Sequence, residues 1–205
     1  RGRVITQGVD RTAHVGGSAE QEDQLVHAAW TKNATIYEGN LRQHTPEGTI
    51  AAFIPDVPRL KALGVDILWL MPIHPIGDVN RKGGENKNNV IVEPGSGSLG
   101  SPYSVQDYHA VNPDYGTHED LRALTAAAHD LGKRVILDWV ANHSAIDCVW
   151  TEEHREYYLL DSLGNLQPPL GTDWWDVAQL DWEGGVENGL YACLLYTSDA
   201  ADDDT

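Results

Sequence analysis

Two patterns of apolar residues alternate along the middle of the chain. Residues 65–72 (VDILWLMP) and 134–140 (RVILDWV) are nearly continuous apolar runs, and residues 34–40 (ATIYEGN) form a shorter run rich in strand-forming residues. A continuous apolar run is typical of a parallel strand that is buried on both faces. We therefore expect three parallel strands, the second and third of them buried on both faces.

Between the first two predicted strands, apolar residues recur at every third or fourth position of residues 46–64, which predicts a helix with one buried face. That face carries Ile50, Phe53, Val57, Leu60 and Leu63. Pro55 and Pro58 predict a break in this helix or a late start. Gly64 suits its C-terminal cap.

Residues 117–132 predict a second helix, in which Thr117 and Asp120 are spaced as in a capping box and Gly132 marks the end. The order is then strand, helix, strand, a long polar loop over residues 73–102, helix, strand. It predicts an α/β fold with right-handed crossovers, which a doubly wound sheet and a β/α barrel both satisfy. No Gly-x-Gly-x-x-Gly pattern follows the first strand, so a dinucleotide-binding sheet is not supported.

The two ends of the chain lack these patterns. Residues 1–28 show no clear period and are expected to be an extension or linker, with the natural start upstream of Arg1. Residues 193–205 (CLLYTSDAADDDT) show no helical or strand period and resemble a translated adapter from sequencing libraries. We expect the natural sequence to end near Ala192.

The net charge of the chain is −17, and it stays clearly negative without the four aspartates of residues 193–205. An acidic chain argues against nucleic acid or an anionic membrane as a partner. No apolar run approaches the roughly 20 residues of a membrane-spanning helix. Without Cys193, Cys148 is alone, so no internal disulfide is expected and the compartment stays open.

Candidate chemistry lies at the end of the third predicted strand, where Asp138 is followed by Asn142 and His143. Functional loops of parallel α/β folds follow the carboxyl ends of the strands. From position alone, Asp138 could equally cap a loop, and His143 could be a structural histidine. No second histidine at i+2 or i+4 supports a metal site built on His143.

Several stretches together resemble the α-amylase superfamily, glycoside hydrolase family 13. They are residues 36–49 (IYEGNLRQHTPEGT), 60–75 (LKALGVDILWLMPIHP), 97–121 (GSLGSPYSVQDYHAVNPDYGTHEDL), 136–143 (ILDWVANH) and 171–182 (GTDWWDVAQLDW). The resemblance covers residues 30–182. It implies a (β/α)8 TIM barrel, of which residues 29–143 carry strands 1–3, and it assigns residues 144–192 to the start of the irregular B domain inserted after strand 3.

The resemblance also implies an activity, the cleavage or transfer of α-glucosidic bonds of starch-like glucans with retention. In a retaining enzyme two carboxyl groups stand about 5 Å apart and pass through a covalent intermediate. The family's nucleophile, acid/base and third Asp follow strands 4, 5 and 7, so we expect none of them in this chain and expect the chain alone to be inactive. A glycosyltransferring member and a catalytically silent sugar-binding homologue are the alternatives.

The resemblance assigns roles to three residues of the predicted site. Tyr103 corresponds to the aromatic platform under the sugar at the cleaved bond, and His143 to the histidine that hydrogen-bonds a hydroxyl of the same sugar. Asp138 corresponds to the strand-3 Asp that orients an Arg near the nucleophile, a supporting and not a catalytic role. The alternative for Tyr103 is a place in the core.

Asn142 corresponds to a calcium ligand of many family members, and its amide oxygen suits that hard cation. The family often has Leu-Pro-Asp-Leu-Asp at the end of the B domain, whereas this chain has VAQLD, with Gln179 in place of the first Asp. The alternative for Asn142 is a hydrogen-bonding role. Residues 83–97 lengthen the loop before Tyr103. Trp174 and Trp175 could line a sugar subsite or pack the B domain, and we favour packing.

Overall fold

The computed structural model describes residues 29–81, 98–184 and 187–199. The predicted extension (residues 1–28), the longer loop (83–97) and the end of the chain (200–205) lie outside the described residues. The first described element is the 3-10 helix η1 (Ala29–Asn33). The chain divides after Asn33, and Ala34 begins the compact unit that contains the predicted site.

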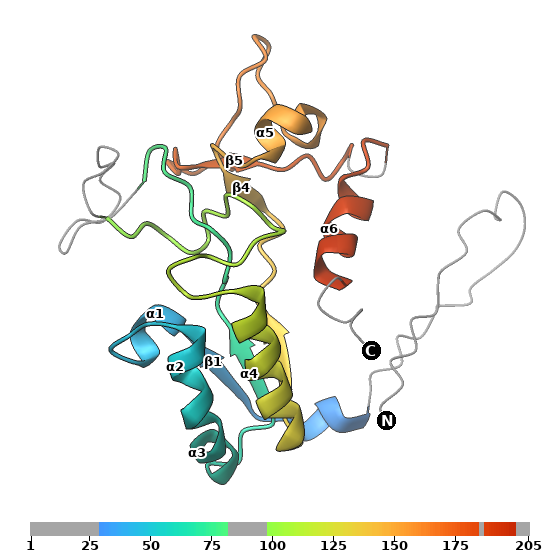
Figure 1. The fold of residues 1–205 in the computed structure, drawn as a ribbon. Helices are drawn as coiled ribbons and strands as arrows, with labels where there is room; N and C mark the ends of the chain where they lie inside the picture. The colour runs from blue at the N-terminus through green and yellow to red at the C-terminus, as the bar shows by residue number, and fades with distance from the viewer. Residues whose placement is uncertain (1–28, 82–97, 185–186, 200–205) are drawn as a thin grey trace, which may run out of the picture. The chain divides into compact units, whose positions relative to one another are not determined.

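Three short parallel strands form one sheet in the order β1-β2-β3, as Figure 1 shows. They are β1 (Ile36–Gly39), β2 (Ile67–Leu70) and β3 (Arg134–Leu137). The register pairs Ile36 with Ile67 and Ile67 with Arg134, so the three strands start level. The three predicted parallel strands are confirmed, and each strand is shorter than its apolar run.

Four helices lie against one face of this sheet. They are α1 (Leu41–His44), α2 (Ile50–Phe53), α3 (Val57–Ala62) and α4 (His118–Asp130), with the 3-10 turn η2 (Ile54–Asp56) joining α2 to α3. The break predicted from the two prolines is therefore this 3-10 turn, in which Pro55 sits in the first positions. Helix α4 begins with the predicted capping box, in which Thr117 Oγ1 accepts from Asp120 N and Asp120 Oδ2 accepts from Thr117 N.

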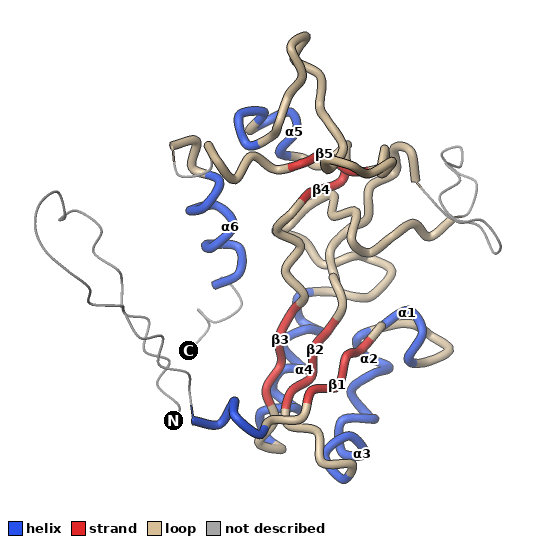
Figure 2. The backbone as a smooth tube through the Cα atoms, turned by 180° about the vertical axis from the view of Figure 1, so that it is seen from behind, coloured by secondary structure: helices blue, strands red, loops and turns tan. Residues whose placement is uncertain are grey.

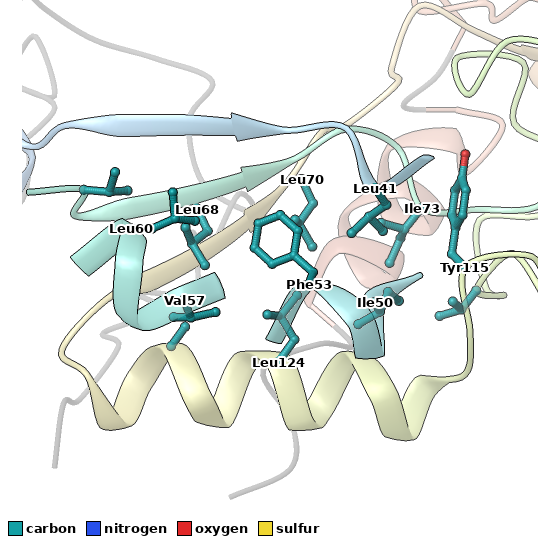
Figure 3. Packing of buried hydrophobic residues seen from close by; sticks show 13 residues of the cluster. Leu41, Ile50, Phe53, Val57, Leu60, Leu68, Leu70, Ile73, Tyr115 and Leu124 are labelled. Carbon is teal, nitrogen blue, oxygen red and sulfur yellow. The ribbon is translucent and has the colours of Figure 1, made fainter. Parts of the chain in front are cut away.

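The main core lies between the sheet and these helices (Figure 3). Ile50, Phe53, Val57 and Leu60 are at most 1% exposed, as the helical period predicts. The prediction for Leu63 is wrong, because its side chain is 66% exposed. Helix α3 ends at Ala62, Leu63 is its C-cap, and the chain turns at Gly64, which has a φ of 91°, so Leu63 lies at the end of the helix and not on its buried face.

The burial predicted for the third strand on both faces is also wrong. Val135 and Leu137 pack against the helix-side core, whereas Ile136 on the opposite face is 40% exposed. Of the three strands, only β2, which has a neighbouring strand on each side, is buried on both faces. Its buried residues are Ile67, Leu68 and Leu70. Among the described residues no strand pairs with the outer edge of β1 or β3, so the sheet does not close into a barrel. The face of the sheet opposite the helices, which would line the inside of a closed barrel, is therefore open.

Beyond β3 the chain forms a second, smaller body of structure (Figure 2). It contains β4 (His143–Ala145), α5 (Trp150–Glu153), η3 (Arg155–Tyr157) and β5 (Val177–Gln179). The sequence predicted an irregular segment after the third strand (residues 144–192, the excursion below), but it did not predict the antiparallel pairing of β4 with β5. Its core includes the stacked rings of Tyr108 and Trp150, with centroids 4.5 Å apart, and the buried Cys148, whose thiol pKa burial raises.

Helix α6 (Leu190–Asp199) is the last described element. It crosses Ala192, near which the natural sequence was expected to end. Leu190 and Leu194, one helical turn apart, are both fully buried. Their burial gives α6 an apolar face, although its sequence shows no longer helical repeat of apolar residues. No helix in the described part of the chain is long and apolar enough to span a membrane.

Candidate functional site

The predicted site residues lie where β3 ends and the chain enters the excursion. Asp138 follows β3 directly, and its backbone N–H donates to the carbonyl of Leu70 at 2.9 Å, which extends the β2–β3 ladder by one position. Because side chains alternate along a strand, Asp138 shares the face of Ile136, away from the helices. The carboxylate therefore stands at the carboxyl edge of the sheet, on the face that helices do not cover.

Tyr103 reaches this carboxylate from the long connection between β2 and α4. Its phenol donates a hydrogen bond of 2.9 Å to Asp138 Oδ2. Burial, which is the largest cause, the hydrogen bond to Asp138 and the charge of that carboxylate together raise the pKa of Tyr103 to about 12. The ring is partly exposed, and the backbone N–H of Tyr103 donates to Ser101 Oγ at 3.2 Å, which holds the local turn.

His143 opens strand β4 and is 9% exposed. Its Nδ1 faces the amide nitrogen of Asn142 at 3.0 Å. Burial lowers the pKa of His143, while Asp176 and the backbone of Tyr103 oppose that shift. A lowered pKa favours the neutral ring, and with Nδ1 accepting from Asn142 the proton of that ring is assigned to Nε2, leaving one N–H donor.

The structure thus brings the three predicted sugar-binding residues together around Tyr103. The phenol of Tyr103 contacts Asp138, and its backbone interacts with His143. Asp138 and His143 come from the two ends of the short segment after β3, whereas Tyr103 is 35 residues before Asp138. The cluster offers a ring face, a carboxylate and an imidazole, which are groups that bind the C–H face and the hydroxyls of a sugar.

Trp174 and Trp175 do not pack inside the excursion, so the packing interpretation is wrong. Their side chains are 41% and 51% exposed. The ring of Trp174 stands edge-on to that of His143, with centroids 5.7 Å apart. An exposed indole beside the imidazole extends the apolar surface of the cluster.

Asn142 is exposed, and its oxygens accept from Gln179, the last residue of β5, and from Leu180, the residue after it. Gln179 Nε2 lies 2.9 Å from the backbone oxygen of Asn142 and 3.5 Å from its Oδ1. The backbone N–H of Leu180 also reaches the backbone oxygen of Asn142, at 3.2 Å. These residues do not fit a calcium ion, because the oxygens that would ligate it already accept hydrogen bonds.

Residues that sequence reasoning missed hold the loop that carries Tyr103. Asp147 Oδ2 accepts from the backbone N–H of Asp78 at 2.8 Å and from Gln106 Nε2 at 3.0 Å. Within the described residues, Asp147 Oδ1 is a buried oxygen that no donor reaches, and a Cβ at Gly77 would collide with it. No local pattern marks Asp147, because its partners lie about 40 and 70 residues away.

A cavity of about 700 Å³ lies apart from these residues, beside β1. Its wall includes His44, which links the phenol of Tyr37 at 3.2 Å to the carboxylate of Asp56 at 2.8 Å. Arg59 donates to the same carboxylate, and this hydrogen bond lowers the pKa of Asp56. The network joins β1 to α3 and shares no residue with the Tyr103 cluster.

Comparison with known proteins places these features in a family. The family model described as "Alpha amylase, catalytic domain" matches residues 20–187. The solved structure of an α-amylase from Lactobacillus plantarum is 42% identical, with a TM-score of 0.69, over 80% of this chain and 35% of that one. A maltogenic α-amylase, AmyB from Thermotoga neapolitana, is 30% identical, with a TM-score of 0.67, over 82% of this chain and 36% of that one.

Curated relatives carry a different name, "Alpha-1,4-glucan:maltose-1-phosphate maltosyltransferase". The one from Mycolicibacterium smegmatis is 40% identical over 56% of this chain and 16% of its own length. The one from Rhodospirillum rubrum is 35% identical over 72% of this chain and 22% of its own length. The chain thus spans about a fifth of the length of these relatives.

Proposed function

The chain belongs to the α-amylase family, and from this membership we propose that it is part of a retaining hydrolase that cleaves α-glucosidic bonds in starch-like glucans. The three strands are then the first three of the family's (β/α)8 barrel. The observation that carries the proposal is the hydrogen bond of 2.9 Å that the phenol of Tyr103 donates to Asp138, five residues before His143. These residues meet at the carboxyl edge of the strands, where barrel enzymes bind their substrates.

Each member of the cluster has a role in this proposal. The ring of Tyr103 covers the apolar face of the sugar at the cleaved bond and excludes water from it, and the negative face of the ring suits a sugar that develops positive charge. His143, neutral near pH 7, donates its Nε2 proton to a hydroxyl of the same sugar. Asp138 holds the phenol of Tyr103 and sets the local negative charge.

The carboxylates that break the bond come, in this proposal, from barrel strands beyond the three described. A retaining reaction needs a nucleophile and an acid/base about 5 Å apart. The family places its nucleophile after strand 4, its acid/base after strand 5 and a third Asp after strand 7. The described residues supply the platform and the hydrogen bonds for one sugar ring, and they leave the covalent chemistry to those strands.

The first experiment reads the intact source gene past the codon for Ala192 and assays the protein expressed from it, called the source protein below. We expect a strand ending in Gly-x-Arg-x-Asp, then a strand-end Glu and a later His-Asp pair. The source protein should then release reducing ends from soluble starch. A reading frame without those carboxylates would contradict the proposal and indicate a silent sugar-binding homologue.

Maltosyl transfer is the second candidate, and the names of the curated relatives favour it. Both activities share the retaining intermediate and differ in what attacks it, either water or the hydroxyl of another glucan. Maltose 1-phosphate with a glucan acceptor distinguishes the two. Release of phosphate with lengthening of the acceptor indicates the transferase, and reducing ends from starch without transfer indicate the hydrolase.

A further inference from the structure

One side-chain amide joins the segment after β3 to strand β5. Gln179 is the last residue of β5 and pairs with His143 across the β4–β5 ladder. Its Nε2 lies 2.9 Å from the backbone oxygen of Asn142, 3.1 Å from that of Leu180 and 3.5 Å from Asn142 Oδ1. Three carbonyl oxygens therefore converge on a single nitrogen.

Convergent carbonyl oxygens repel one another unless a donor or a cation lies between them. Calcium fills such a set with its charge, and an amide NH₂ fills it with two hydrogens. The two contacts near 3 Å use those hydrogens, and Asn142 Oδ1 shares one of them at the longer distance. In the described part of the chain, no group of three or more His, Cys, Asp or Glu side chains could hold a metal ion.

The other contacts of Asn142 leave its oxygens few free lone pairs with which to bind a cation. Its backbone oxygen accepts from both Gln179 Nε2 and the Leu180 N–H, which engages both lone pairs. The Nδ2 of Asn142 faces His143 Nδ1 at 3.0 Å, which orients Oδ1 toward Gln179. A cation could enter only by displacing the Gln179 amide.

We propose that the amide of Gln179 takes the place of a structural cation in this protein, so that the junction between Asn142 and β5 is independent of calcium. The amide joins Asn142, which directly precedes β4, to the end of β5. Because it is a neutral hydrogen-bond donor of the protein itself, a chelator does not remove it. Position 179 is then the switch between a metal-free and a calcium-binding junction, because a glutamate there replaces the NH₂ donor with a second acceptor oxygen and adds a negative charge.

The test measures thermal unfolding of the source protein with calcium and with a chelator, and it does not depend on activity. The Tm of the wild type should be the same in both. Gln179→Glu should unfold at lower temperature in the chelator, because its carboxylate faces three carbonyl oxygens, and calcium should raise its Tm by at least about 2 °C. Gln167→Glu is the matched control, because Gln167 Nε2 also donates to two backbone carbonyls, at 3.2 and 3.0 Å. It should show no calcium response.

Two results would overturn the proposal. One is a Gln179→Glu protein that responds to calcium no more than Gln167→Glu does. The other is a wild type whose Tm falls in the chelator, where the fall disappears in Asn142→Leu, since that places a bound cation at Asn142. A chelator effect that survives in Asn142→Leu comes from a different site and supports the metal-free junction. The wild-type and Asn142→Leu measurements decide the question even if Gln179→Glu does not fold.

Discussion

The phenol of Tyr103 donates a hydrogen bond of 2.9 Å to Asp138 Oδ2, across 35 residues of chain. This contact joins the loop after β2 to the end of β3. It also gives the phenol a partner that resists its ionisation, because a phenolate beside a carboxylate places two negative charges together. The consequence is a tyrosine whose titration reports on the site.

Tyr103 should ionise at high pH only, with a pKa of about 12 instead of 10.0. A pKa raised by folding stabilises the folded state fully below pH 10.0, and this contribution is lost as the pH rises through about 12. The stability of the source protein relative to Tyr103→Phe should therefore decline across that window. Asp138→Asn should lower the pKa of Tyr103 only in part, because burial is the larger cause. Absorbance of the phenolate measures the pKa, and an unchanged pKa in Asp138→Asn would contradict the role of the carboxylate.

His143 should make the folded protein sensitive to acid. Burial lowers its pKa from 6.5, so it stabilises the fold above pH 6.5 and this contribution is lost as the pH falls through the lowered pKa. Tm values measured from about pH 7 down to about pH 5 should fall less steeply for His143→Asn than for the wild type. His129, which is exposed on α4, provides the control, and His129→Gln should keep the wild-type slope. Equal slopes for all three proteins would show that His143 does not contribute.

Phe53 and Leu63 should differ sharply when truncated, although the sequence pattern places both on one helical face. Phe53 is fully buried, so Phe53→Ala should cost about 3–5 kcal/mol of unfolding free energy. Leu63 is 66% exposed, so Leu63→Ala should change that free energy by less than about 0.5 kcal/mol. Denaturant titration of the source protein compares them. A loss above 2 kcal/mol for Leu63→Ala would contradict the placement of that side chain.

Trp174 should contribute to glucan binding through its exposed face beside His143. If a sugar ring stacks there, Trp174→Ala should raise KM for the glucan about 2- to 10-fold with little change in Tm. Trp175→Ala is the matched control, because its side chain is also exposed but only Trp174 packs edge-on to His143. Kinetics with soluble starch measure the difference. Equal changes in the two variants would indicate a general effect on the excursion.

Local sequence was sufficient to predict the three parallel strands, the helices between them and their order along the chain. The period of Ile50, Phe53, Val57 and Leu60, and the capping box of Thr117 and Asp120, depend on residues a few positions apart, and both are present in the structure. The apolar runs located the three strands of the parallel sheet. The motifs around Tyr103, Asp138 and His143 identified a family that the comparisons confirm.

Only the tertiary structure showed which side chains are buried and which distant residues are hydrogen-bonded to each other. The sequence could not show that Ile136 is half exposed, since burial depends on which strands pair with β3. Nor could it show that Tyr103 donates to Asp138, or that the side-chain amide of Gln179 donates to Asn142, 37 residues away. Periodicity and capping are properties of neighbouring residues, whereas hydrogen bonds between distant segments depend on how the chain brings those segments together.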